Sequence, residues 1–206
     1  MKAGSGLQKS FDALALPGVV LGHRLIVPGD DLELRPDEKA AFSKSVEKVR
    51  RASGAARIVA RRLMAQLGYP EQSVTKSAGG APIWSPGLVG SLAHSSDVAV
   101  AALARHADFA SLGIDIEPAE PLHAHLLDLV ATPTERHAIA HDPCGGRLLF
   151  VIKEAVYKAV YPLDAIFLEH HDVEVNIAAG KATVRGGRTV DFRHISSSHI
   201  VALAFI

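Results

Sequence analysis

Two stretches of the chain, half its length apart, share one pattern: a serine-rich turn followed by an apolar strand. They read HSSDVAVAAL at residues 94–103 and SSSHIVALAF at residues 196–205 of a 206-residue chain. Strand composition alone can produce such a pair, but a duplication would give two halves of about 100 residues, a usual domain size. The pattern therefore predicts two similar halves, which we place at residues 1–108 and 109–206.

The order of the predicted elements favours an α+β fold. Strands are predicted at residues 19–27, 89–104 (two strands around Ser95–Ser96), 111–117, 172–177, 182–186, 189–194 and 199–206. Helical patterns cover residues 37–67, with a break expected at Gly54, and residues 147–160, with an end expected at Pro162; a capping box at Thr132, Pro133 and Glu135 marks another helix start. Because helices and strands do not alternate regularly, a doubly wound sheet is not expected.

Composition excludes several classes of protein. The 22 lysines and arginines equal the 22 aspartates and glutamates, so no overall positive field attracts nucleic acid. The single cysteine, Cys144, allows neither an internal disulfide nor a cysteine-rich zinc site, which favours a reducing compartment such as the cytoplasm. No run of 18 apolar residues is present, so no membrane span is expected.

The segment SLGIDIEP, residues 111–118, carries the first chemical signal. Side chains alternate along a strand, so Gly113, Asp115 and Glu117 share one face, and the two isoleucines occupy the other. Two residues span about 6.6 to 6.8 Å, so both carboxylates could address one hard cation such as Mg²⁺, and Gly113 leaves room for a close approach. An edge strand with a solvated acidic face is the other interpretation.

The helix FVIKEAVYKAVYP, residues 150–162, carries the second signal. Glu154 and Lys158 are four residues apart on one helix face, and Lys153 precedes them. The arrangement is either an ordinary helix ion pair or a third carboxylate beside cations that bind phosphate oxygens.

Three motifs follow one another along the chain: GSLAH, GIDIE and KEAVYK. In this order and at these separations, they resemble those of the 4′-phosphopantetheinyl transferases, specifically the larger two-halved type. The segment AGGAPIWSPGLVGSLAH resembles the stretch of the family that leads up to, and ends in, a histidine. One subgroup of the family is found with mycobacterial and enterobactin-type synthases. Its members resemble this chain in the arginine-bearing helix VEKVRRASGAARIVARRLMAQLG and in the lysine that follows it, Lys76. The resemblance covers roughly residues 40–165.

The resemblance implies a fold and an activity. The fold would be two similar α/β halves related by a pseudo-twofold axis, with the active site at the interface between them. The activity would be Mg²⁺-dependent transfer of 4′-phosphopantetheine from coenzyme A to a serine of an apo acyl or peptidyl carrier protein, releasing 3′,5′-ADP. Mn²⁺ is the alternative ion, and a monomer would suffice.

The resemblance also assigns roles to residues. Asp115, Glu117 and Glu154 match the Mg²⁺ ligands, and Glu154 is the candidate general base. Lys158 matches the lysine that stabilises charge on the diphosphate and the leaving group. The remaining predicted contacts with coenzyme A are Arg57, Lys76, Ser91, His94 and Lys153. Ala93 stands where the family has a hydroxyl beside the histidine, and Ser91 is the candidate to compensate.

Other interpretations account for part of the pattern. A Mg²⁺-dependent nucleotide pyrophosphohydrolase would explain the carboxylates but not GSLAH. A weakened coenzyme A-binding or carrier-binding module is conceivable because of Ala93. The histidine pairs at 123/125, 137/141 and 170/171 lack a third zinc ligand, so we expect them to be surface side chains.

Overall fold

The computed structural model describes residues 7–8 and 11–206, which divide into two compact units. One unit spans Ala15–Leu112, and the other contains Gly113–Ile206 together with the described residues among the first 14. The predicted division after residue 108 falls a few residues earlier. The grouping of the N-terminal segment with the C-terminal half was not foreseen, because no local pattern marks it.

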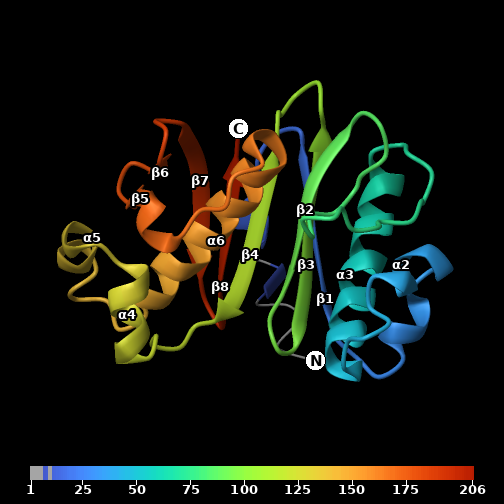
Figure 1. The fold of residues 1–206 in the computed structure, drawn as a ribbon, viewed down its shortest axis with the longest axis horizontal. Helices are drawn as coiled ribbons and strands as arrows, with labels where there is room; N and C mark the ends of the chain where they lie inside the picture. The colour runs from blue at the N-terminus through green and yellow to red at the C-terminus, as the bar shows by residue number, and fades with distance from the viewer. Residues whose placement is uncertain (1–6, 9–10) are drawn as a thin grey trace. The chain divides into compact units, whose positions relative to one another are not determined.

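The unit Ala15–Leu112 is a three-stranded antiparallel sheet covered by a long helix (Figure 1). Its elements are β1 (Val19–Leu25), the 3-10 helix η1 (Asp30–Glu33), α2 (Pro36–Ala40), α3 (Glu47–Gln66), β2 (Leu88–His94) and β3 (Val98–Arg105). The strand order is β1-β3-β2. Leu63 and Met64 of α3 pack against Leu88 and Leu103 of the sheet, which forms the core of this unit.

The helix α3 runs without interruption through Gly54, so the predicted break there is wrong. A Cβ atom at Gly54 would lie 1.9 Å from the backbone oxygen of Asp30. Gly54 therefore allows η1 to pack directly on α3, and this tertiary contact offsets the cost of about 1 kcal/mol that glycine adds inside a helix. The pattern at residues 37–67 does contain two helices, but the interruption lies between α2 and α3.

The second unit is a five-stranded sheet with a long helix against it (Figure 1). Its elements are β4 (Leu112–Pro118), α4 (Ala124–Val130), α5 (Pro133–Ala138), α6 (Gly145–Asp164), the 3-10 helix η2 (His170–Asp172), β5 (Val173–Asn176), β6 (Lys181–Val184), β7 (Thr189–Ser196) and β8 (His199–Phe205). The strand order is β4-β8-β7-β6-β5. Leu149, Ile152 and Val156 of α6 belong to one apolar core with Ile200 and Ala202 of β8.

Pro162 lies inside α6, so the expected helix end at this proline is wrong. The helix continues to Asp164 and stops at Ala165, which adopts the left-handed conformation with φ 51°. A proline so near the C-terminus removes one intrahelical hydrogen bond without ending the last turn.

The two units repeat one plan, and the predicted α+β fold with two similar halves is confirmed. Each has a first strand, a short helix, a long helix and a hairpin, and the two serine-rich repeats lie in the hairpins β2–β3 and β7–β8. The short helices α2 and α5 each begin with proline and carry a buried capping glutamate, Glu38 or Glu135. Each glutamate binds a cation of the following long helix, Arg61 of α3 or Lys153 of α6.

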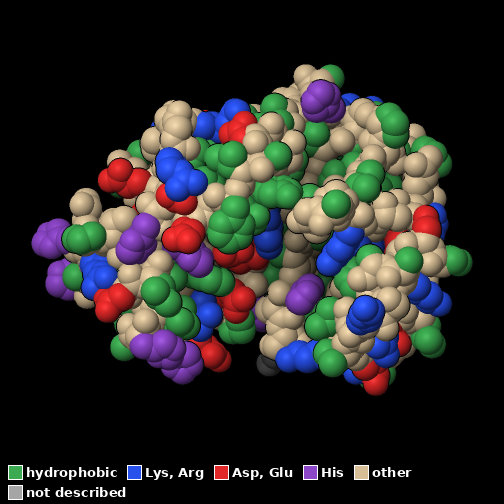
Figure 2. Space-filling view, in the orientation of Figure 1, with side chains coloured by type: hydrophobic (Ala, Val, Ile, Leu, Met, Phe, Trp, Pro, Cys, Tyr) green, Lys and Arg blue, Asp and Glu red, His purple; other side chains and the backbone are tan. Residues whose placement is uncertain are grey.

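No helix in the described part of the chain is both long and apolar enough to cross a membrane. On the face that Figure 2 shows, acidic and basic side chains are interspersed, in agreement with the balanced count of charges.

Candidate active site

Strand β4 lies directly against helix α6 because Gly113 has no side chain. A Cβ atom at Gly113 would lie 1.8 Å from the backbone oxygen of Ala155. The room that Gly113 was expected to leave is therefore filled by α6. Asp115 and Glu117, on the same face of β4, consequently meet side chains of this helix.

Asp115 is paired with Lys158. Its side chain is deeply buried, and Oδ1 accepts a hydrogen bond of 2.6 Å from Lys158 Nζ. The same ammonium group lies 3.3 Å from the backbone oxygen of Ile114. Burial raises the pKa of Asp115 to about 6; Lys158 opposes this rise, and the negative charges of Glu154 and Glu117 add to it. The site thus holds more negative charge than Lys158 neutralises.

The other two predicted carboxylates also contact cationic groups. Glu117 Oε2 lies 3.7 Å from Arg147 Nη1, and burial raises the pKa of Glu117. Glu154 Oε1 lies 3.3 Å from Nε2 of His170, and the contact with His170 is the main cause of the lowered pKa of Glu154. Glu154 is therefore ionised at neutral pH and can accept a proton.

The three carboxylates are electrostatically coupled, but they do not form a ready coordination sphere. Among the residues that the structure describes, no group of three or more His, Cys, Asp or Glu side chains is arranged to hold a metal ion. The donor set itself suits Mg²⁺, which prefers carboxylate oxygens. A bound cation would offset the repulsion from Glu154 and Glu117, which adds to the rise in the pKa of Asp115 that burial causes. The magnesium assignment stays a prediction.

Lys153 lies in the interior of its unit, not in this cluster. Its side chain is 1% exposed, and Nζ donates hydrogen bonds to Glu135 Oε2 at 2.7 Å, to the backbone oxygen of Val130 at 2.8 Å and to that of His170 at 2.9 Å. An ammonium group has three donors, and all three are used. We therefore correct its assignment from a phosphate contact to a structural anchor.

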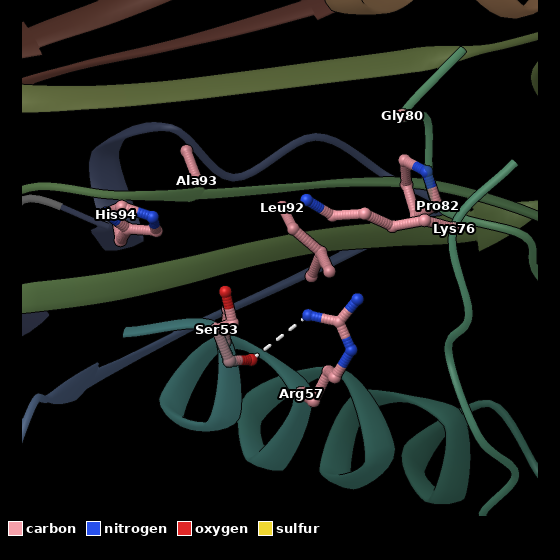
Figure 3. A pocket seen from close by; sticks show the side chains of 9 residues that line it. Ser53, Arg57, Lys76, Gly80, Pro82, Leu92, Ala93 and His94 are labelled. Atoms are coloured by element: carbon pink, nitrogen blue, oxygen red, sulfur yellow. Dashed lines mark hydrogen bonds between the residues drawn. The ribbon is translucent and has the colours of Figure 1, made fainter. Parts of the chain in front are cut away.

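A pocket in the other unit contains three of the predicted coenzyme A contacts. Arg57 of α3, Lys76 and His94 at the end of β2 line it together with Ser53 and other residues (Figure 3). The remaining lining residues are Ala56, Gly80, Pro82, Leu92 and Ala93. Cationic and apolar groups line this pocket, and such a combination suits an anionic ligand with an apolar part.

Arg57 is held in place from behind the pocket. Its Nε donates to the backbone oxygen of Val74 at 2.8 Å, and Nη1 donates to that of Ser53 at 3.1 Å. Glu38 Oε1 lies 3.8 Å from Nε. No hydrogen-bond partner of Nη2 is found in the described part of the chain. Burial, and secondarily the charge of Arg57, lowers the pKa of Lys76, so an anion in the pocket would relieve this repulsion.

Ser91 does not line this pocket. Its side chain is 3% exposed within β2, whereas its neighbours Leu92, Ala93 and His94 reach the lining. The structure therefore gives no support for Ser91 as a replacement for the hydroxyl missing at Ala93.

Three contributors were missed in the sequence. Arg147 precedes Glu154 by seven residues, which puts both on one helix face, and this spacing was a usable signal. Glu38 could have been found by comparison of the two halves: it lies two residues after Pro36, as Glu135 lies two residues after Pro133, and both cap a short helix. His170 was expected to be a surface histidine, and no local pattern shows that it contacts Glu154.

The raised pKa of Asp115 predicts a pH-dependent effect on stability. The folded state holds the proton of Asp115 more tightly than the unfolded chain does. Ionising Asp115 therefore destabilises the folded state: this free-energy cost is small near pH 4 and is fully present above about pH 6. Without metal, Asp115→Asn should therefore raise the free energy of unfolding by about 3 kcal/mol near pH 7.5 and change it little near pH 4.

Denaturant titrations in the presence of a chelator would measure this difference. The matched control is Asp191→Asn, the same substitution at a half-exposed carboxylate. An equal loss of stability at both pH values in Asp115→Asn would contradict the assigned penalty.

Comparisons with known proteins give one consistent result. Residues 37–104 match the model of the 4′-phosphopantetheinyl transferase N-terminal domain, and residues 111–204 match that of the 4′-phosphopantetheinyl transferase superfamily. The chain is 40% identical over 163 residues to the 4′-phosphopantetheinyl transferase Npt of Nocardia iowensis, covering 78% of this chain and 73% of the relative.

Two further relatives agree. The transferase Svp of Streptomyces mobaraensis is 38% identical over 181 residues, which cover 80% of this chain and 74% of the relative. The transferase PptT of Mycobacterium tuberculosis is 35% identical over 144 residues, 68% and 63% of the two chains. The chain belongs to the 4′-phosphopantetheinyl transferase superfamily.

Proposed function

We propose that this protein transfers 4′-phosphopantetheine from coenzyme A to a serine of an apo acyl or peptidyl carrier protein. The observation that carries the proposal is the coupled acidic cluster, with Lys158 on Asp115 and an ionised Glu154 on the adjacent helix. Membership of the superfamily supports the same reaction.

In the reaction, the serine oxygen forms a bond to the phosphorus that carries the pantetheine group. The bond from this phosphorus to the bridging oxygen breaks, and 3′,5′-ADP leaves with that oxygen. Glu154 is the candidate that takes the serine proton: it is ionised at neutral pH, although its lowered pKa makes it a weaker base than an ordinary glutamate. Lys158 stabilises the negative charge that develops on the leaving group.

Asp115, Glu117 and Glu154 would hold Mg²⁺ or Mn²⁺. When bound, the ion would supply positive charge to the diphosphate oxygens. The chemistry of three oxygen donors supports this assignment, together with the raised pKa values of Asp115 and Glu117.

Arg57, Lys76 and His94 would bind the 3′-phosphate and the adenosine of coenzyme A. The supporting observation is the cationic pocket itself, in which Nη2 of Arg57 and the ammonium group of Lys76 are available to an anion. A monomer carrying both groups of residues would suffice for catalysis.

Incubation with Mg²⁺, coenzyme A and an apo carrier protein tests the proposal. A gain in carrier mass of one phosphopantetheine, with release of 3′,5′-ADP, is the expected result. Phosphate release without a carrier would favour the pyrophosphohydrolase, and binding of coenzyme A without any mass change would favour the binding module.

A further inference from the structure

The 3-10 helix η2 brings a histidine to the candidate general base. His170 Nε2 lies 3.3 Å from Glu154 Oε1, and the two side chains are each about one-third exposed. We propose that His170 is a positioning residue that orients the Glu154 carboxylate for the transfer reaction. The inference rests on the proposed function, in which Glu154 accepts the serine proton and contacts the metal ion.

His170 is itself held firmly by α6. The ammonium group of Lys153, the residue before Glu154, donates 2.9 Å to the backbone oxygen of His170. That lysine is anchored by its buried pair with Glu135. The imidazole ring packs against Phe150, with the ring centroids 5.4 Å apart. The backbone and the ring of His170 are therefore both fixed relative to the helix that carries Glu154.

The contact is directed at Glu154 alone. His170 Nε2 is shielded from solvent and completes no hydrogen bond among the described residues; the Glu154 carboxylate, 3.3 Å away, is the acidic group within ion-pair distance of it. Either the charged imidazole or the neutral Nε2–H form donates toward the carboxylate, so the inference does not depend on the charge of the ring.

This geometry leaves the two oxygens of Glu154 in different roles. Oε1 faces His170, and no partner of Oε2 is recorded among the described residues. A donor on Oε1 limits rotation of the carboxylate and so presents Oε2 in one direction. Partners of this kind behind a metal ligand are worth roughly 10- to 100-fold in metal affinity or activity.

Two substitutions at His170 separate orientation from packing. His170→Ala removes the donor, while His170→Gln restores an amide N–H near the position of Nε2 without the aromatic ring. Neither changes the backbone oxygen that Lys153 binds, so η2 keeps its anchor. His171→Ala, at the exposed neighbouring histidine, is the matched control.

Binding of Mn²⁺ alone, measured by electron paramagnetic resonance, is the first readout, and kcat and KM for transfer are the second. We expect His170→Ala to weaken Mn²⁺ affinity about tenfold and to lower kcat by at least as much, with KM for coenzyme A little changed. His170→Gln should recover most of both losses, and His171→Ala should match the wild type.

Wild-type Mn²⁺ affinity and kcat in His170→Ala would overturn the inference. So would a His170→Gln variant no better than His170→Ala, because the contact would then act only through packing. If the wild-type protein binds Mn²⁺ but gives no carrier mass gain, the proposed function fails, and the Mn²⁺ comparison still tests the orientation of Glu154.

Discussion

Glu154→Gln should lower phosphopantetheine transfer by about 1,000-fold or more while the fold stays intact. Gln has the same shape as Glu but can neither take the serine proton nor supply a charged oxygen to a cation. Glu154 carries its negative charge at neutral pH, so the substitution removes a charged carboxylate from the site. Asp115→Ala should have a comparable effect. Carrier mass gain over time, with circular dichroism to confirm folding, measures both.

Glu120→Gln is the matched control, because Glu120 is an exposed acid near Glu117 whose backbone oxygen, not its side chain, accepts from Arg147. This variant should retain wild-type turnover. Near-normal turnover in Glu154→Gln would contradict the role of Glu154 as base and ligand.

Lys153→Met should reduce the free energy of unfolding by about 3 to 5 kcal/mol. The substitution leaves Glu135 buried without its counterion and removes hydrogen bonds to the backbone oxygens of Val130 and His170. Methionine has a similar length and no charge, so the loss reflects the ammonium group more than packing. Denaturant unfolding monitored by circular dichroism measures the change.

Lys181→Met is the matched control, because Lys181 pairs with Asp191 where both side chains are about half exposed. An exposed pair is worth less than about 1 kcal/mol. Adding Glu135→Gln to Lys153→Met should recover part of the stability, since no unpaired charge remains buried. If Lys153→Met weakened only coenzyme A binding and left unfolding unchanged, Lys153 would be a phosphate contact after all.

Features that depend on neighbouring residues were predictable from the sequence. The alternation of apolar side chains gave the strands, the capping box at Thr132 began α5 as expected, and the paired serine-rich turns indicated two similar halves. These patterns are local because backbone geometry and capping act within a few residues. A common site for Asp115, Glu117, Glu154 and Lys158 was implied by the resemblance to the transferase family, not by a local pattern.

Features that depend on packing were decided only by the tertiary structure. Gly54 reads as a helix break, but the close approach of Asp30 makes it a required position within α3. Lys153 was predicted to contact coenzyme A, but Glu135, 18 residues earlier in the chain, lies where the fold buries both side chains as a pair. Burial and pairing are set by elements distant in sequence, so a residue's own neighbours cannot reveal whether its charge meets solvent, a ligand or an opposite charge.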